Sequence, residues 1–366
     1  MRRPVVAGAP VVVKVGSSSL AQDAGGLDEA AVGHVVAQVD RLWELGHPTI
    51  LVSSGAVAAG LPALGLTRKP TDLPGLQVAA AVGQGRLMER YTQEFAARER
   101  ITGQVLLTRD ILAQRNQYLH AREALDRMLS LGVVPVVNEN DTVVVEELKF
   151  GDNDRLAAIV SHLVSAGMLV ILTDTEGLYT SDPRLGDDAE LLSAVRHTDE
   201  ILDELRSTGS GGLLGSGGVA TKIAAARMAA FSGIPTVIAS SSINNVAIRA
   251  AAGEDIGTWI DPRPSRLTAR KLWIAFGQPA DGSLVIDDGA RDALVAGGRS
   301  LLAVGVVEVE GDFVEGEAVE IVATGGELVG KGRARIPARA LRSSLGKHSS
   351  EAGGAAVHID DLVLLV

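Results

Sequence analysis

The stretch VVVKVGSSSL, residues 11–20, places a single lysine inside an apolar run that is typical of a buried strand. An unpaired ammonium is costly to bury, so Lys14 must either reach water or meet a fixed anion. Gly16 and the serines at 17–19 favour an anion, because small residues let backbone N–H groups approach a phosphate. The alternative is a lysine on an edge strand, where its charge hinders aggregation. This stretch alone leaves both interpretations open.

Strand-like and helix-like patterns alternate from this stretch to about residue 260. The strand-like runs lie at 11–15, 49–53, 104–107, 133–137, 168–173 and 236–239. The helix-like stretches lie at 28–45, 75–98, 116–131, 153–166 and 221–232. Continuous apolar strands separated by amphipathic helices indicate a mainly parallel sheet that is covered on both faces. We therefore expect an α/β fold, a three-layer αβα sandwich.

The segment DPRPSR at 261–266 interrupts this alternation with two prolines and indicates a domain boundary. We expect a first domain over 1–262, a linker helix over 263–280 and a second domain over 281–366. In the last of these, short apolar runs are separated by Gly-Asp and Gly-Gly pairs, which predict a small β-rich barrel.

The composition excludes several classes of protein. A chain of 366 residues with 46% hydrophobic residues is long enough for a large core and a second, smaller domain. The net charge of -11 does not favour binding to nucleic acid or to an anionic membrane. Cysteine is absent, which excludes a disulfide framework and fits a reducing compartment. No apolar run reaches membrane length and no signal peptide is recognisable, so we expect a soluble, cytoplasmic protein.

Polar residues follow several of the predicted strands, where ligands of open parallel sheets bind. Ser54 and Gly55 form a second small-residue turn ahead of a helix, which suits either an anion or an ordinary helix cap. Acidic and amide side chains follow at 138–141 and again at 152–154. One such residue already caps a helix, so two clusters indicate binding of an ammonium group, positioning of lysines or a water-mediated Mg²⁺ site.

Two further segments have the character of a nucleotide site. Thr173 and Asp174 end a strand in a loop that suits a base and ribose, although a plain turn is the alternative. The glycine-rich tract 209–218 leads into Thr221 and Lys222 at a helix start, which suits phosphates, whereas a mobile linker is the alternative. Neither a Walker A motif nor a Rossmann fingerprint is present. Two lysines, glycine loops and an acid-amide cluster together favour phosphoryl transfer.

Eight segments occur in the order found in the glutamate 5-kinase family of the amino acid kinase superfamily, which the chain resembles from residue 11 to about 260. They are VVVKVGSSSL, VSSGAVAAG, AAVGQGRLM, VLLTRDI, VVPVVNENDTV, FGDNDRLAA, LTDTEGLYTSDPR and GSGGVATK. The tail from GARDALVAGG onward resembles a PUA domain. The resemblance implies transfer of the γ-phosphoryl group of ATP to the γ-carboxylate of L-glutamate, the first step of proline biosynthesis. It also implies Mg²⁺ bound mainly through ATP, with no side-chain metal ligand.

The resemblance assigns roles to individual residues. Lys14 contacts the transferring phosphate, Lys222 stabilises the developing charge, and Asp154 orients both lysines. The residues that bind glutamate are Ser54, Asp141 and Asn153. Thr173 and Asp174 line the ATP site, and its phosphates are covered by Ser216, Gly217, Gly218, Val219, Ala220, Thr221 and Lys222. Val219 and Ala220 depart from the Met-Ser pair of many members, which removes a hydroxyl but keeps the backbone N–H groups.

The resemblance also implies a homo-oligomer (a dimer or a tetramer), feedback inhibition by proline, and coupling to glutamyl phosphate reductase. A related kinase acting on acetylglutamate or aspartate is the first alternative, and an RNA-binding PUA protein is the second. Acids outnumber bases by 14 to 8 over 281–366, and only 331–342 forms a basic patch, so nucleic acid is not the expected partner.

Overall fold

The computed structural model describes residues 2–22, 25–112, 114–143, 153–183, 189–208, 218–277, 279–345 and 354–366. The chain divides into two units, Met1–Arg266 and Leu267–Val366. The division falls inside the segment 263–280, which the sequence predicts as a linker.

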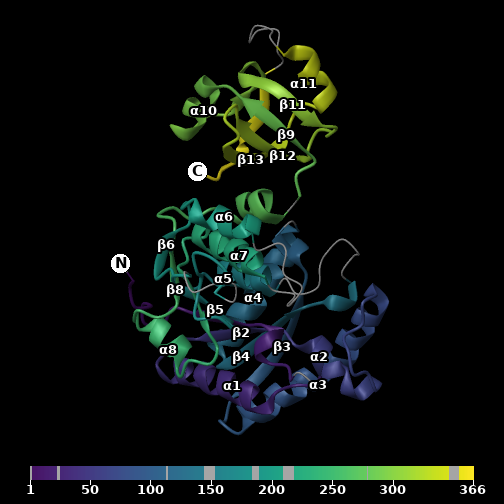
Figure 1. Cartoon of the computed structure of the whole chain (residues 1–366), viewed down its shortest axis with the longest axis vertical. Helices are drawn as coiled ribbons and strands as arrows, with labels where there is room; N and C mark the ends of the chain where they lie inside the picture. Colours follow the sequence, from purple (N-terminus) through teal and green to yellow (C-terminus); the bar gives the residue numbers. More distant parts are fainter. Residues whose placement is uncertain are drawn as a thin grey trace. The chain divides into compact units, whose positions relative to one another are not determined.

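The described part of the first unit is built on an eight-stranded sheet with the order β3-β4-β2-β1-β5-β7-β8-β6 (Figure 1). Its strands are β1 (Val11–Val15), β2 (Thr49–Ser53), β3 (Ile101–Leu107), β4 (Val133–Glu139), β5 (Met168–Thr173), β6 (Ala194–Arg196), β7 (Thr236–Ser240) and β8 (Thr258–Asp261). Neighbouring strands are parallel, apart from β7 and β8. The mainly parallel sheet is therefore confirmed. β6 and β8 have no predicted counterpart, because runs of three and four residues show too little alternation to be recognised.

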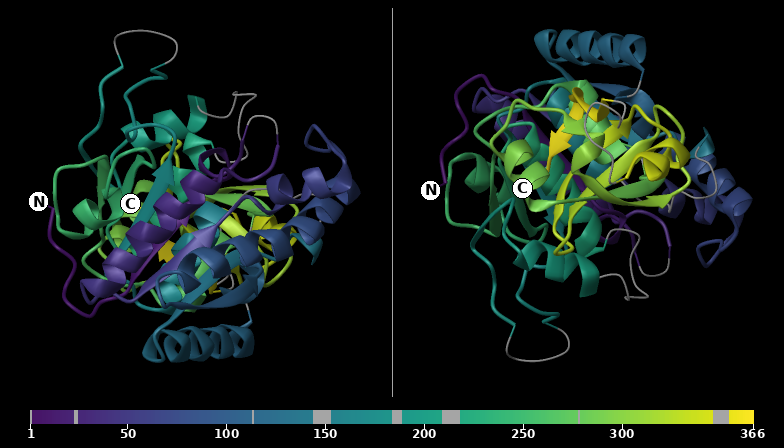
Figure 2. Two further views of the ribbon diagram at one scale, coloured as in Figure 1. Left: turned by 90° about the horizontal axis from the view of Figure 1, so that it is seen from below. Right: turned by 90° about the horizontal axis from the view of Figure 1, so that it is seen from above.

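Helices cover both faces of this sheet, which confirms the three layers. They are α1 (Glu29–Glu44), α2 (Ala56–Gly60), α3 (Leu73–Ala96), α4 (Arg115–Ser130), α5 (Asn153–Leu163), α6 (Ile201–Thr208), α7 (Val219–Phe231) and α8 (Val246–Ala251). One face carries α1, α3 and α8, and the other carries α4, α5 and α7. The left view of Figure 2 looks onto the face with α1 and α3. Short 3₁₀ segments are η1 (Ser17–Ser19), η2 (Pro62–Leu64), η3 (Arg109–Leu112) and η4 (Asp141–Val143).

The lysine of the first strand lies in the interior of the sheet. Lys14 of β1 is in register with Val52 of β2 on one side and with Ile171 of β5 on the other. The four valines of β1 are fully buried. Because β1 is hydrogen-bonded on both sides, the edge-strand explanation of Lys14 is wrong, and its charge needs a partner inside the protein.

The second unit contains a curled sheet with the order β10-β14-β13-β12-β9-β11. Its elements are α9 (Ala269–Leu272), the π-helix η6 (Trp273–Gly277), β9 (Gly282–Ile286), α10 (Asp288–Val295), β10 (Leu301–Leu302), η7 (Ala303–Gly305), β11 (Val306–Gly311), β12 (Ala318–Ala323), β13 (Leu328–Ala334), α11 (Ala338–Ser344) and β14 (Ala355–Leu364). The β-rich character predicted for this region is confirmed. Ile274 and Ala275, from the segment predicted as a linker, pack on Val363 of β14 within this unit.

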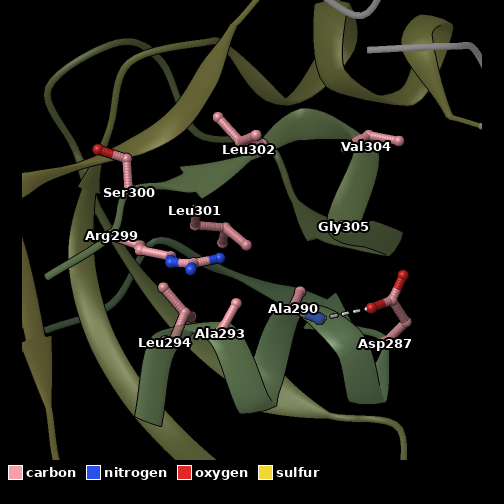
Figure 3. Close-up of a pocket in the computed structure, with 10 residues that line it drawn as sticks. All are labelled: Asp287, Ala290, Ala293, Leu294, Arg299, Ser300, Leu301, Leu302, Val304 and Gly305. Atoms are coloured by element: carbon pink, nitrogen blue, oxygen red, sulfur yellow. Dashed lines mark hydrogen bonds between the residues drawn. The ribbon is translucent and has the colours of Figure 1, made fainter. Parts of the chain in front are cut away.

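A hollow of about 250 Å³ lies between α10 and the β10–η7 segment (Figure 3). Its floor is mainly apolar, and the side chain of Arg299 extends over Ala293 and Leu294. Asp287 lies at its rim, where its carboxylate accepts a hydrogen bond of 2.7 Å from the backbone N–H of Ala290. That carboxylate therefore caps α10.

None of the helices in the described ranges combines the length and hydropathy needed to cross a membrane.

Candidate active site

Asp154 joins the two lysines that the sequence analysis selected. It lies at the start of α5, with no exposed surface, and its Oδ1 is 2.6 Å from Nζ of Lys14. Nζ of Lys222, near the start of α7, is 3.9 Å from the other carboxylate oxygen, Oδ2. Lys14 is 2% exposed and Lys222 is 9% exposed. One buried carboxylate thus lies between two buried ammonium groups.

Thr221 holds the same carboxylate from the side of α7. Its Oγ1 donates a hydrogen bond of 2.7 Å to Oδ2 of Asp154. The sequence analysis places Thr221 among the residues that cover the ATP phosphates. In the structure its hydroxyl lies 2.7 Å from Oδ2 of Asp154 and 2.9 Å from the carbonyl oxygen of Gly218, so Thr221 ties the start of α7 to the start of α5.

Electrostatics keep Asp154 ionised. Burial alone raises the pKa of this carboxyl, but the ammonium groups of Lys14 and Lys222, with hydrogen bonds from Lys14 and Thr221, hold it below its ordinary value. Burial lowers the pKa of Lys222; the charges of Asp154 and Asp174 oppose this effect, and the charge of Lys14 adds to it. An anion that entered beside the two lysines would restore part of the solvation that burial removes from them.

A second group of polar side chains lies where β2 and β4 end. Asn153 is adjacent to Asp154 on α5, and its Nδ2 donates to Oγ of Ser54 at 3.0 Å and to Oδ1 of Asn138 at 2.9 Å. Ser54, Asn138 and Asn153 are all buried. The structure therefore brings two of the three predicted glutamate-binding residues, Ser54 and Asn153, into direct contact.

The third of these residues, Asp141, begins η4 and is partly buried. Burial raises the pKa of its carboxyl to about 6, although the positive charge of Lys69 acts in the opposite direction. A carboxylate in this state is stabilised by a cation that binds to it. The described contacts do not link Asp141 to Ser54 or Asn153 by a direct hydrogen bond.

The residues predicted to bind the nucleotide lie at the carboxyl end of β5 and at the start of α7. Thr173 is buried, and its hydroxyl donates to Oδ1 of Asp174 at 3.0 Å. Gly218 is the N-cap of α7, and Val219 and Ala220 begin its first turn. The backbone N–H groups of a first helical turn have no partner within the helix and can bind an anion. Ser216 and Gly217 lie outside the described residues.

Two residues of the site were not assigned a role from the sequence. Asn138, within the acid-amide cluster, accepts from Asn153 and donates through Nδ2 to Oε1 of Gln84 at 2.7 Å. Gln84 lies in the middle of α3, and nothing in the sequence distinguishes it until the packing of α3 against the end of β4 is known. Among the described residues, no group of three or more His, Asp or Glu side chains is arranged to hold a metal ion.

The sequence matches two known domain families. Residues 9–240 match the family described as the amino acid kinase family, and residues 282–352 match the PUA domain. A glutamate 5-kinase of Marinomonas sp. is 44% identical over 373 residues, and one of Pseudomonas syringae pv. tomato is 46% identical over 374 residues. Both alignments cover 100% of this chain and 100% of the relative.

Among solved structures, a crystal structure of UMP kinase from Bacillus anthracis is 15% identical and superposes with a TM-score of 0.49, over 72% of this chain and 100% of that chain. The family assignment rests on the sequence matches and not on this structural similarity. The chain belongs to the glutamate 5-kinases, a branch of the amino acid kinase family, and ends in a PUA domain.

Proposed function

We propose that this protein transfers the γ-phosphoryl group of ATP to the γ-carboxylate of L-glutamate, giving L-glutamyl 5-phosphate in the first step of proline biosynthesis. The observation that carries the proposal is the arrangement of Lys14 and Lys222 around Asp154. Two buried ammonium groups on either side of one carboxylate place positive charge where the anionic groups of the two substrates would meet. The relatives named glutamate 5-kinase support glutamate as the acceptor.

The chemistry of the acceptor explains why the site needs no general base. A glutamate side chain has an ordinary pKa of about 4.3, so its γ-carboxylate is already ionised at neutral pH. One of its oxygens forms the new bond to the γ-phosphorus, while the bond from that phosphorus to the bridging oxygen of ADP breaks. No proton is transferred in this step. The barrier comes mainly from repulsion between the two anions, which positive charge in a dry site relieves.

Each lysine has a distinct part in this step. Lys14, rigidly held on an interior strand, neutralises the incoming carboxylate and the transferring phosphoryl group. Lys222, at the start of α7, neutralises the charge that develops toward the leaving ADP. Asp154 fixes both ammonium groups, and Thr221 fixes Asp154. An ammonium about 4 Å from a phosphate oxygen contributes on the order of 4 kcal/mol at the dielectric constant typical of protein surfaces.

We assign substrate recognition to the polar group beside these lysines. Asp141 binds the α-ammonium of glutamate, whose charge compensates its buried carboxylate. Ser54 and Asn153 orient the substrate carboxylates through their hydroxyl and amide groups. This assignment disfavours acetylglutamate, because acetylation removes the positive charge that Asp141 would bind.

The nucleotide lies between Thr173–Asp174 and the segment 216–222 in this proposal. Magnesium fits as an ion carried by the ATP phosphates, because the buried carboxylate of the site, Asp154, is already surrounded by two ammonium groups. When bound, the metal ion would offset phosphate charge. The protein residues hold the nucleotide, exclude water and supply the two ammonium groups.

Family resemblance suggests three further properties, which we propose for this chain. It assembles as a homo-oligomer, a dimer or a tetramer; proline inhibits it; and it delivers its labile product to glutamyl phosphate reductase. We place the reaction in the cytoplasm. Light scattering tests the assembly, and initial rates with added proline test the inhibition.

The proposed activity is tested by following ADP release with ATP and one acceptor at a time: L-glutamate, N-acetyl-L-glutamate or L-aspartate. We expect glutamate to be the acceptor with the highest kcat/KM. Activity confined to either of the other two acceptors would overturn the proposal and identify the related kinase instead.

A further inference from the structure

We propose that Gln84 contacts the substrate directly: its Nε2 group donates a hydrogen bond to the α-carboxylate of glutamate, while its Oε1 holds Asn138. The inference rests on the proposed function and adds a specificity-determining residue to it. Gln84 belongs to α3, which supplies none of the site residues that the sequence analysis selected. Three observations and the chemistry of the substrate lead to this assignment.

The first observation is that α3 has a fixed position beside the turn that carries Ser54. A Cβ atom added at Gly83 would lie 1.7 Å from the carbonyl oxygen of Ala56 and 2.5 Å from the backbone nitrogen of Gly60. A Cβ atom at Gly60 would lie 2.1 Å from the carbonyl oxygen of Ala79. The backbones of α2 and α3 therefore touch, and this contact requires glycine at both positions. Gln84, next to Gly83, is held at a set distance from the start of α2.

The second observation is the orientation of the Gln84 amide. The backbone N–H of Glu139 donates to the Asn138 side chain at 2.9 Å, and because an N–H can only donate, the atom that it meets is Oδ1. Nδ2 of Asn138 must then face Gln84, at 2.7 Å. A donor there requires an acceptor, so Gln84 presents Oε1 to Asn138 and directs Nε2 elsewhere.

The third observation is that this Nε2 is buried and has no hydrogen-bond partner in the part of the chain that the structure describes. A buried amide N–H without an acceptor is unfavourable, and such groups are uncommon in folded proteins. The same amide is connected through Asn138 to Asn153 and Ser54. A ligand that supplies an acceptor at this place would complete the network.

The chemistry of the substrate completes the argument. Glutamate carries three charged groups, and the proposed function directs its γ-carboxylate to the lysines and its ammonium to Asp141. The α-carboxylate remains, and it needs a donor. Nε2 of Gln84 is a neutral donor in the hydrogen-bonded group that already includes Ser54 and Asn153. A site built to hydrogen-bond one substrate group discriminates strongly against analogues that lack it.

The substitution Gln84→Glu separates this role from a purely structural one. Glutamate keeps the length of the side chain and an oxygen that accepts from Asn138, but it replaces the Nε2 donor with an anionic acceptor. Gln93→Glu is the matched control, because Gln93 lies on the exposed face of the same helix. Thermal unfolding of both variants shows whether they fold as the wild type does.

Initial rates provide the measurement, with 4-aminobutyrate as a competitive inhibitor that lacks the α-carboxylate. We expect Gln84→Glu to raise the KM for L-glutamate by about 50-fold or more, because a donor is replaced by a repelling charge. The kcat and the KM for ATP should change by less than about threefold, as expected for a contact made equally in the ground and transition states. The inhibition constant of 4-aminobutyrate should not rise, and Gln93→Glu should behave as the wild type.

Each other outcome is decisive. A KM for glutamate that is unchanged in Gln84→Glu overturns the contact and leaves Gln84 a purely structural residue. A lower KM also overturns it, because Nε2 would then face the ammonium. An equal increase in the inhibition constant of 4-aminobutyrate shows general damage to the site and likewise overturns it. Absence of glutamate-dependent ADP release in the wild type would instead overturn the proposed function, and this assignment with it.

Discussion

Thr221 donates a hydrogen bond of 2.7 Å from its hydroxyl to Oδ2 of Asp154, the carboxylate oxygen that also faces Lys222. The contact joins the first turns of α5 and α7. The two helices thus bring Lys222, the partly exposed Thr221 and Asp154 together with Lys14 from β1. Positioning of the two ammonium groups depends on this carboxylate, and the orientation of the carboxylate depends on Thr221.

Removal of the Thr221 hydroxyl tests this dependence. We expect Thr221→Val to lower kcat by about tenfold, because a hydrogen bond to a charged group contributes about 1.5–3 kcal/mol and only part of it bears on positioning. Thr221→Ser, which retains the hydroxyl, should recover most of the wild-type kcat. If valine and serine variants have the same kcat, the hydroxyl does not position Asp154.

Asp154 itself should be essential for both stability and turnover. Asp154→Asn removes the carboxylate that lies between two buried ammonium groups, and loss of one partner of a buried ion pair costs about 3–5 kcal/mol. We expect a lower free energy of unfolding in denaturant titrations and a kcat reduced by about 10³-fold or more. A variant with wild-type stability would show that solvent, rather than Asp154, compensates the lysines.

Asp141 should show opposite effects on stability and substrate binding. Its folded-state pKa of about 6 lies above the ordinary value of 3.8, so the folded state binds the proton more tightly than the unfolded state does. Ionisation of this buried group therefore costs stability as the pH rises from about 4 to 6, and the cost is complete above pH 6. We expect Asp141→Asn to stabilise the substrate-free protein at pH 7 by up to about 3 kcal/mol, an advantage that nearly disappears at pH 4.

The same group should govern the pH dependence of glutamate binding. Protonation of Asp141 below about pH 6 removes the charge that we assign to the substrate ammonium. The KM for glutamate should therefore rise as the pH falls below 6, and it should be high at every pH in Asp141→Asn. A pH-independent KM in the wild type would separate Asp141 from substrate binding.

His162 gives stability a pH dependence of the opposite sign. It lies on α5, and burial, together with the charges of Arg266 and Arg122, lowers the pKa of its imidazole to about 4. Between pH 4 and 6.5 the unfolded state binds the proton and the folded state does not, so this histidine destabilises the fold as the pH falls. We expect His162→Gln to reduce the loss of Tm between pH 7 and 4.5, with exposed His120→Gln as the control. An identical loss of Tm in the two variants would contradict this role.

The sequence contains enough information to predict the frame of the site but not all of its contacts. Lys14 stands out because charge within an apolar strand needs an explanation. Asp154 stands out because it lies in the second acid-amide cluster, and Lys222 because it follows a glycine-rich tract at a helix start. These features are local in sequence. The strand β3 begins three residues earlier than predicted, at Ile101, because an edge strand of mixed exposure lacks a continuous apolar run.

The contacts that could not be predicted are those between distant segments. Gln84 and Asn138 are 54 positions apart, and Thr221 and Asp154 are 67 positions apart. Neither the acceptor for Asn138 nor the partner of the Thr221 hydroxyl follows from residue type, since both depend on how α3 and α7 pack. Asn153 illustrates the same limit, because its choice of Ser54 and Asn138 follows from the meeting of β2, β4 and α5.

Trapping of the acyl phosphate product with hydroxylamine tests most directly whether Lys222 assists phosphoryl transfer to glutamate. The wild type is compared with Lys222→Ala, after thermal unfolding has shown that the two proteins have the same Tm. We predict that the wild type forms γ-glutamyl hydroxamate in the presence of ATP and L-glutamate. Lys222→Ala should form it at least about 10³-fold more slowly, because the developing charge loses its ammonium partner. Hydroxamate formation at a similar rate in both proteins, or none with glutamate in the wild type, would contradict the account.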